Sequence, residues 1–122
     1  MLTACPKMNN QLKNQTLNIM ETITVQQLKE RMDNGEKVNL IDCREPAEYE
    51  EYNIGATLIP LGDIQNGDLG PLEGKEDEEI IIHCRSGKRS AAACLYLDSM
   101  GFKKTVNVEG GVLAWKEAFD NE

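Results

Sequence analysis

Apolar residues recur along this chain with two different spacings, and the spacing separates helices from strands. Apolar side chains three and four residues apart within polar segments are typical of helices with one buried face. Short apolar runs bounded by glycine, proline or charged residues are typical of strands. The pattern predicts helices at 24–34, 46–52, 88 or 89 to 100 and 112–119, and strands at 37–43, 57–59, 79–83 and 105–108.

Several helix ends carry their own signals. Thr24 followed by Gln27 is a capping-box pattern, in which the two side chains satisfy free backbone amides at a helix start. Gly35 offers a stop for this first helix, and Pro46 suits the first turn of the next one. In the third helix, the helical spacing puts four residues on one face: Ala92, Leu95, Tyr96 and Ser99.

The order of the predicted elements indicates the fold class. Strands alternate with helices over short connections, which implies crossover units and therefore a mostly parallel sheet with helices on both faces. The strand at 79–83 reads EIIIH, a continuous apolar run of the kind found where both faces of a strand are covered. We therefore expect an α/β domain.

The length of 122 residues fits one domain. Residues 1–20 are polar with scattered Leu, Ile and Met, so we interpret them as a loosely ordered leader before a domain at 21–122. The segment 61–74 contains four of the ten glycines, and we expect a loop there with one helical turn near Asp63.

The charge balance restricts the partners. There are 21 acidic and 13 basic residues, for a formal net charge of −8, and this field repels nucleic acid and anionic membranes. No apolar run approaches the roughly 18 residues that span a bilayer, and the first 20 residues are too polar for a secretory signal. We expect a cytoplasmic monomer that binds neither nucleic acid nor membrane.

The four cysteines, with a single histidine and no C-x-x-C, do not form a pattern typical of a zinc site or a disulfide framework. We expect neither a metal nor an organic cofactor. Each thiol is therefore considered singly: Cys5, Cys43, Cys84 and Cys94.

Cys84 lies near the start of the segment HCRSGKRSAAAC, residues 83–94, beside three cations. Cys84 follows the buried strand directly, and a helix begins four or five residues later, so consecutive backbone amides and a helix N-terminus surround the sulfur. Gly87 permits a positive φ in this loop. Such surroundings, with the cations Arg85, Lys88 and Arg89, bring a thiol pKa from about 8.5 to about 3.5–7.5. We expect a reactive thiolate in an anion cradle.

The length of the loop separates two kinds of anion. Cys-based phosphatases place an arginine after five intervening residues, so that the loop wraps a tetrahedral phosphate. Here Ser90 occupies that position, and Arg89 comes one residue early. The shorter ring fits a single terminal sulfur on the cysteine better than a phosphoryl group.

From about residue 22 to 119 the sequence resembles single-domain rhodaneses, the thiosulfate sulfurtransferases. The resemblance is carried by LIDCREPAEYE at 40–50, LIPLGDI at 58–64, IIHCRSGKRSAAA at 81–93 and VNVEGGVLAW at 106–115. It implies a five-stranded parallel sheet flanked by helices and a catalytic cysteine that cycles through a persulfide. It also implies an active loop of six residues, where related phosphatases and arsenate reductases have seven.

Carried over by position, the resemblance makes Cys84 the nucleophile. The substrate-binding loop would comprise Arg85, Ser86, Gly87, Lys88 and Arg89, of which the last two hold the oxyanion part of the donor. Asp42 and Arg44 match the family's Asp-x-Arg at a strand end and are expected to support the site. Two positions depart from the family: 53–56 lacks the usual histidine and one residue, and Cys43 stands where valine is common.

Other polar residues have competing interpretations. His83 adjoins the nucleophile, but neighbouring strand residues face opposite sides, so its ring is expected to point away from the sulfur of Cys84. Cys94 lies among alanines and is expected in the core. Cys43 either packs in place of valine, which we favour, or resolves a persulfide or disulfide.

Two further groups are interpreted as structural. Arg44, paired with Asp42 or Glu45, is expected to tie loops together rather than to bind substrate. The last helix is expected to direct its larger apolar side chains to the core: Leu113, Trp115 and Phe119.

Three functions fit these residues. The first is a sulfurtransferase that moves sulfur from a small anionic donor such as thiosulfate to a thiol or cyanide acceptor through a Cys84 persulfide. The second is a phosphatase or arsenate reductase of the same architecture. The third is a relay module that receives persulfide sulfur from a partner protein. Rapid turnover with thiosulfate and cyanide would favour the first, and loading by a protein donor alone would favour the third.

Overall fold

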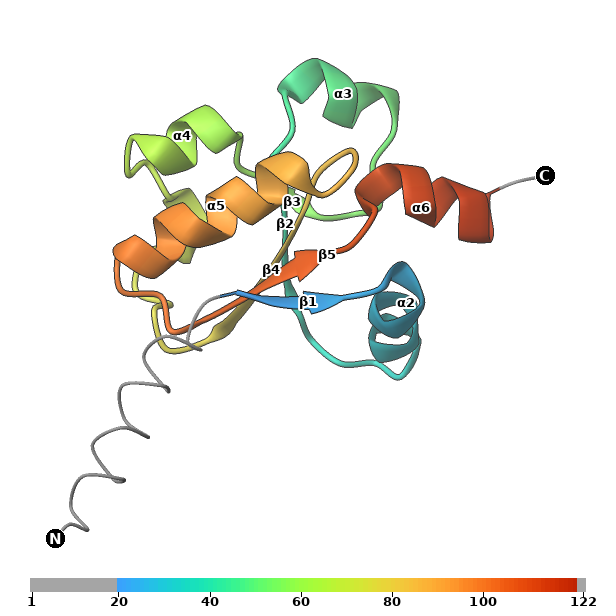
Figure 1. Ribbon diagram of the computed structural model, residues 1–122, viewed down its shortest axis with the longest axis horizontal. Coiled ribbons are helices and arrows are strands. Elements are labelled where there is room, and N and C mark those ends of the chain that lie inside the picture. Colours follow the sequence, from blue (N-terminus) through green and yellow to red (C-terminus); the bar gives the residue numbers. More distant parts are fainter. Residues whose placement is uncertain (1–19, 121–122) are drawn as a thin grey trace, which may run out of the picture.

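A computed structural model describes residues 20–120. Residues 1–19 of the expected leader lie outside the described residues, as do 121–122, whereas Met20 packs against the core. The elements, shown in Figure 1, are β1 (Glu21–Ile23), α2 (Val25–Asp33), β2 (Asn39–Asp42), α3 (Pro46–Glu51), β3 (Thr57–Leu58), α4 (Leu61–Gln65), the 3-10 turn Gly70–Leu72, β4 (Glu79–His83), α5 (Lys88–Ser99), β5 (Lys104–Val108) and α6 (Gly111–Phe119).

The five strands form one sheet in the order β1-β5-β4-β2-β3, and every neighbouring pair is parallel. The predicted α/β fold class is thereby confirmed. Because the strands are parallel, the carboxyl ends of β2 and β4 lie at the same edge, with Asp42 paired to His83. Ligands of open α/β sheets bind at this edge.

The core has two layers, one on each face of the sheet. One cluster joins alternate residues of β4 to α4 and α5, and the other joins the sheet to α2 and α6. Figure 1 shows α4 and α5 together on one face and α2 on the other. Within β4, Ile80 and Ile82 face the first cluster while Ile81 faces the second, and none of the three is exposed. Burial of each side chain stabilises the fold by about 1.5–3 kcal/mol, so the end of β4 is firmly held.

The predicted helix signals are present in the structure. Thr24 Oγ1 accepts a hydrogen bond from the amide of Gln27 at 3.0 Å, and the amide of Thr24 donates to Gln27 Oε1 at 2.8 Å. Helix α2 ends at Asp33, before Gly35, which has φ +81°. Pro46 is the first residue of α3. Local chemistry therefore sets where these helices begin and end.

The hydrophobic pattern does not predict β1. This strand pairs with β5 through Glu21↔Val106 and Ile23↔Val108. Two of its three residues are exposed, so it has no apolar alternation that a pattern could detect. It forms because the edge of β5 offers backbone donors and acceptors to the chain entering the domain.

Two helices expose apolar residues. In α5 the face that carries Leu95 and Tyr96 is exposed, and these residues are 54% and 40% accessible. The buried face of α5 consists of Ser90, Ala93, Cys94 and Leu97. In α6 the expected core role is wrong for Leu113, which is 45% exposed. Trp115 and Phe119 do pack together, edge to face at 4.8 Å. Residues two apart on a helix face opposite sides, so Leu113 and Trp115 cannot share the core.

Candidate active site

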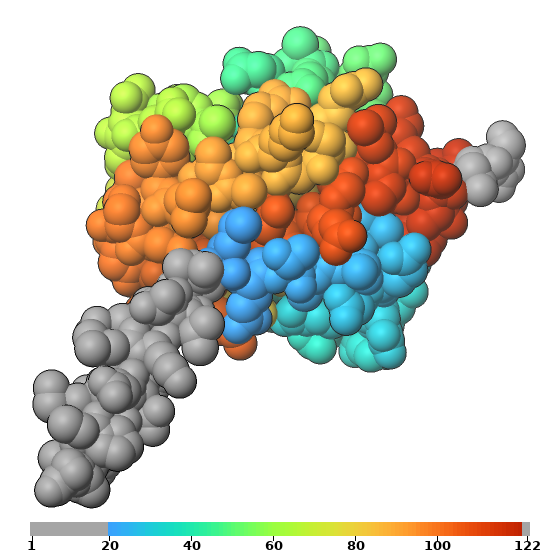
Figure 2. Space-filling model, viewed as in Figure 1, coloured from blue at the N-terminus to red at the C-terminus, as the bar shows by residue number. Residues whose placement is uncertain are grey.

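Cys84 lies directly after β4, and the loop that follows it leads into α5 at Lys88. Gly87 caps the helix with φ +104°, a left-handed conformation that suits glycine and turns the chain back over the sulfur. Cys84 itself is only 1% exposed. In the space-filling view the segment after β4 reaches the surface between α3 and α6 (Figure 2). The predicted order of strand, cysteine, glycine-containing loop and helix is present.

Hydrogen-bond donors of the loop converge on the sulfur of Cys84. The amides of Gly87 and Ser90 donate to Sγ at 3.1 and 3.3 Å, and the Ser90 hydroxyl lies 3.4 Å from it. The Cys43 side chain and these donors lower the pKa of Cys84 to about 4. A hydrogen bond from the Cys43 side chain contributes most to this shift, and those from Ser90 and Gly87 follow. Burial acts in the opposite direction. The thiolate is therefore the stable form at neutral pH.

Asn107 links β5 to this loop. Its Nδ2 donates to the carbonyl of Gly87 at 3.2 Å, and its Oδ1 accepts a hydrogen bond from the Ser90 hydroxyl. Asn107 is buried, with 8% of its surface exposed. Sequence reasoning missed both Ser90 and Asn107 as site residues. The available signal was a single amide between the two valines of β5.

Helix α6 holds the beginning of the loop from the other side. The amide of Val112 donates to the carbonyl of Cys84 at 2.9 Å, and the amide of Leu113 donates to the carbonyl of Arg85 at 3.0 Å. This approach requires glycine at position 111, where φ is +54° and a Cβ atom would lie 2.3 Å from the Cys84 carbonyl oxygen. The Gly110-Gly111 turn is thus part of the active loop's support.

The predicted cations have different environments. Arg85 and Lys88 are exposed, as is Ser86. Arg89 is half-buried, and both of its terminal nitrogens donate to the carboxylate of Glu48 at 2.8 Å. This bidentate pair lowers the pKa of Glu48 to about 2. Nothing in the sequence around Glu48 predicts this contact, because α3 and the loop lie 41 residues apart.

Asp42 and Arg44 form a buried ion pair, 0% and 4% exposed. Nε and Nη2 of Arg44 donate to the Asp42 carboxylate at 2.8–3.1 Å, and Nη2 also donates to the carbonyl of Tyr52 at 2.6 Å. The pair therefore ties the end of β2 to the end of α3. Neither residue is a hydrogen-bond donor to Sγ in the part of the chain that the structure describes.

His83 is buried on the sheet beside Asp42. Its Nδ1 lies 3.4 Å from the backbone oxygen of Cys84, and its Nε2 lies 3.6 Å from Asp42 Oδ2. Burial is the main reason why the pKa of His83 lies below its ordinary value, so the ring is neutral. The contacts of the ring are with backbone and Asp42, not with the reactive sulfur.

The other described cysteines are buried and free. Cys94 lies in the first core cluster, where burial raises its pKa to about 12. Cys43 is in the same cluster, and its amide donates to the carbonyl of His83, which places it beside Cys84. Among residues 20–120, no group of three or more His, Cys, Asp or Glu side chains could hold a metal ion. No helix in that range is both long and apolar enough to cross a membrane.

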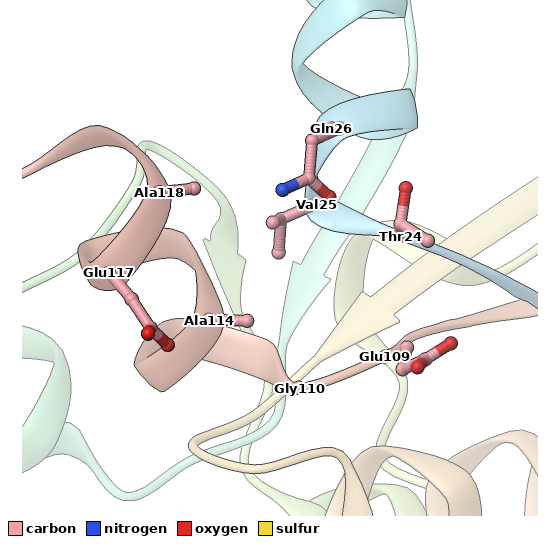
Figure 3. Close-up of a pocket in the computed structure, with 8 residues that line it drawn as sticks. All are labelled: Thr24, Val25, Gln26, Glu109, Gly110, Ala114, Glu117 and Ala118. Atoms are coloured by element: carbon pink, nitrogen blue, oxygen red, sulfur yellow. The ribbon is translucent and has the colours of Figure 1, made fainter.

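Two cavities differ in their relation to the loop. One of about 410 Å³ lies between the start of α2 and α6, and its polar side chains include Gln26, Glu109 and Glu117 (Figure 3). It contains no thiol and no cation. The other, of about 260 Å³, borders the loop and is lined by Arg85, Leu113 and Lys116 among others. A substrate that approaches the loop would meet the second cavity.

Comparison with known proteins shows which family this chain resembles in sequence and fold. The sequence profile of the rhodanese-like domain matches residues 24–118. YtwF of Bacillus subtilis is 44% identical over 98 residues, which cover 80% of this chain and 91% of that protein. A sulfurtransferase of Allochromatium vinosum is 35% identical over 98 residues, which cover 80% of this chain and 89% of that protein.

Longer proteins contain the same unit. MoeZ of Mycobacterium tuberculosis, named as an adenylyltransferase/sulfurtransferase, is 38% identical over 95 residues; the match covers 77% of this chain but spans only 24% of that protein. Among solved structures, a rhodanese-like domain protein of Staphylococcus aureus superposes with a TM-score of 0.68 at 34% identity. That match covers 79% of this chain and 91% of the other.

Proposed function

This chain belongs to the rhodanese-like domain family, and from that membership and the geometry of its loop we propose that it is a sulfurtransferase that carries sulfur as a persulfide on Cys84. The single observation that carries the proposal is the convergence of the Gly87 and Ser90 donors on one buried sulfur. Relatives named sulfurtransferases, such as that of Allochromatium vinosum, support it.

The first half-reaction loads the cysteine. The Cys84 thiolate attacks the outer sulfur of a sulfane donor such as thiosulfate, a new S–S bond forms, and the S–S bond of the donor breaks. Sulfite leaves with the bonding electron pair, and the outer sulfur of the Cys84 persulfide carries the negative charge. Amide donors that are already in place stabilise anionic sulfur without reorganisation. Arg85 lines the cavity beside the loop and Lys88 is exposed at the start of α5, so both would attract the oxyanion part of the donor.

The second half-reaction discharges the sulfur. An acceptor thiolate or cyanide attacks the outer sulfur, the S–S bond of the persulfide breaks, and the Cys84 thiolate leaves with the electron pair. A low pKa makes Cys84 a good leaving group in this step. The chemistry uses side chains and backbone amides of this chain and requires no metal or organic cofactor.

Arg89 has a conditional part in this scheme. Its two terminal nitrogens are engaged by Glu48, so binding of the donor's oxyanion would compete with that carboxylate. An arginine fork binds tetrahedral phosphates as well as planar carboxylates, so the tetrahedral oxyanion of thiosulfate suits it too. We include Arg89 as a donor-binding residue whose contribution depends on release from Glu48.

Intact-protein mass spectrometry after treatment with thiosulfate tests the proposal. The native chain is expected to gain the mass of one sulfur, and subsequent cyanide is expected to remove it as thiocyanate. A Cys84→Ser variant should gain nothing, whereas Cys94→Ser, which changes a buried thiol away from the loop, should load normally. Loading of the Cys84→Ser variant at another residue would refute the assignment of the nucleophile.

Two other outcomes would replace the proposal. Hydrolysis of an aryl phosphate without sulfur loading would favour a phosphatase. Loading by a persulfidated protein donor, with no loading by thiosulfate, would favour a relay module.

A further inference from the structure

A second thiol stands beside the reactive sulfur. β2 and β4 are parallel with Asp42 opposite His83, and the amide of Cys43 donates to the carbonyl of His83 at 3.1 Å. Cys43 and Cys84 are therefore the next residues along two neighbouring strands, which run about 4.8 Å apart, and their side chains face the same side. Both lie in one core cluster, 0% and 1% exposed.

The Cys43 thiol remains protonated in this position. Its hydrogen bond to Cys84 is the main reason why the pKa of Cys43 lies far above its ordinary value, and burial acts in the same direction. A protonated thiol is a weak hydrogen-bond donor. The sulfur of Cys84 thus receives donors from two directions: Cys43 after the end of β2, and Gly87 and Ser90 at the start of α5.

The charged groups around this pair are few among the described residues. The charge of Asp42, on the same strand, raises the pKa of Cys43, and that of Arg89, on α5, lowers it. Arg44 is paired with Asp42, and His83 is buried beside Cys84 with its pKa lowered. None of these side chains donates a hydrogen bond to Sγ in the described part of the chain, whereas the strand register places Cys43 next to Cys84.

We propose that Cys43 is a positioning residue for sulfur transfer. Its thiol donates a hydrogen bond to Sγ of Cys84, and this hydrogen bond stabilises the unloaded thiolate more than the persulfide. This inference rests on the proposed function. In the thiolate the negative charge is on Sγ, which the S–H group contacts. In the persulfide the charge is on the outer sulfur, one bond further away. Cys43 therefore favours discharge over loading.

Opposite effects on the two half-reactions follow. A thiol of lower pKa leaves faster, whereas its intrinsic nucleophilicity falls with a Brønsted coefficient of about 0.4–0.5. Loss of the S–H donor should raise the titration midpoint of Cys84 by about one pH unit. At a pH above both midpoints, Cys43→Val should then load about threefold faster and discharge about threefold more slowly than the native chain.

Three variants separate positioning from packing. Cys43→Val removes the donor, Cys43→Ser retains a donor, and Cys94→Val makes the same change at a buried thiol of the same core cluster that lies on α5. The titration midpoint is measured first, from the rate of iodoacetamide alkylation at Cys84 against pH, by peptide mass spectrometry. This assay contains no sulfur donor, so it remains decisive for Cys43 even if sulfur transfer itself is not observed.

Single-turnover loading by thiosulfate and discharge by cyanide are then measured separately. For Cys43→Val we expect a higher titration midpoint of Cys84, faster loading and slower discharge. Cys94→Val should behave like the native chain, and Cys43→Ser should give values near native. An unchanged midpoint in Cys43→Val, or rate changes of the same sign in both half-reactions, would overturn the proposal. If Cys43→Val does not fold, Cys43→Ala removes the same donor. Release of sulfide with a Cys43–Cys84 disulfide would also overturn it, because Cys43 would then be a nucleophile.

Discussion

Replacement of Gly111 by alanine tests whether α6 supports the active loop. The backbone of Gly111 has φ +54°, and an added Cβ would lie 2.3 Å from the Cys84 carbonyl oxygen and 2.7 Å from that of Arg85. The chain offers a matched control, because Gly70 has φ +55° with nothing within 4 Å of an added Cβ. Both substitutions carry the strain of a left-handed alanine, and only one also displaces the loop.

The expected costs differ by a measurable amount. Left-handed strain costs about 1–2 kcal/mol, and this is the whole expected effect of Gly70→Ala. Gly111→Ala adds an overlap of about 1–3 kcal/mol. It also weakens the two hydrogen bonds that Val112 and Leu113 donate to the loop, at about 1 kcal/mol each. Gly111→Ala should therefore lower the free energy of unfolding by about 3–5 kcal/mol more than Gly70→Ala does.

Urea unfolding followed by fluorescence of Trp115, the one tryptophan of the chain, measures this difference. With a slope of about 1.5 kcal/mol/M, the midpoints of the two variants should differ by roughly 2–3 M urea. Alkylation of Cys84 at low pH should also slow in Gly111→Ala, because displacement of the loop moves the donors away from Sγ. Equal midpoints and equal alkylation in the two variants would refute the argument that α6 holds the loop.

Four further substitutions test the ion pairs. Glu48→Gln frees the guanidinium of Arg89, so the KM for thiosulfate should fall about threefold, whereas Arg89→Ala should raise that KM about tenfold. Initial rates measure both values. A higher KM in Glu48→Gln would contradict the competition between Glu48 and thiosulfate for Arg89. Asp42→Asn leaves the buried Arg44 unpaired and should cost about 3–5 kcal/mol in urea unfolding. Asp33→Asn, in the exposed pair with Lys29, should cost less than about 1 kcal/mol, and similar values for the two would contradict the role of burial.

Local signals account for the parts of the fold that the sequence predicts well. The run EIIIH predicts β4 with its observed bounds, because both faces of that strand are covered and each of its three central positions therefore requires an apolar residue. The capping box predicts the start of α2 because Thr24 and Gln27 satisfy each other's backbone amides within four residues. Such features depend on neighbours in sequence, so the sequence alone contains the information.

Other features depend on segments that meet only after folding. β1 is specified by the edge of β5 rather than by its own side chains. Glu48 contacts Arg89 across 41 residues, and Asn107 contacts Gly87 across 20. The apolar pattern predicts Leu113 in the core, although its position on α6 directs it to the cavity beside the loop. These errors have one cause: a pattern identifies an element but not the neighbour it packs against.

Cys43 shows how close the sequence comes to the site. The sequence predicts Cys43 at the end of one strand and Cys84 directly after another. The carboxyl ends of parallel strands lie at a common edge of the sheet. What the pattern lacked was the strand order, which makes β2 the direct neighbour of β4. With that order known, two thiols that are 41 positions apart in the chain become adjacent.

The source of the thiolate's stability also differs from what the charge pattern indicates. The sequence places Arg85, Lys88 and Arg89 around Cys84, yet the influences that most lower its pKa are hydrogen bonds from Cys43, Ser90 and Gly87. Arg89 is matched by Glu48, and the other two cations are exposed to solvent, which screens them. Uncharged donors act only at hydrogen-bond distance and do not alter the long-range field. A protein with a net charge of −8 can therefore keep one sulfur ionised without becoming attractive to nucleic acid or anionic membranes.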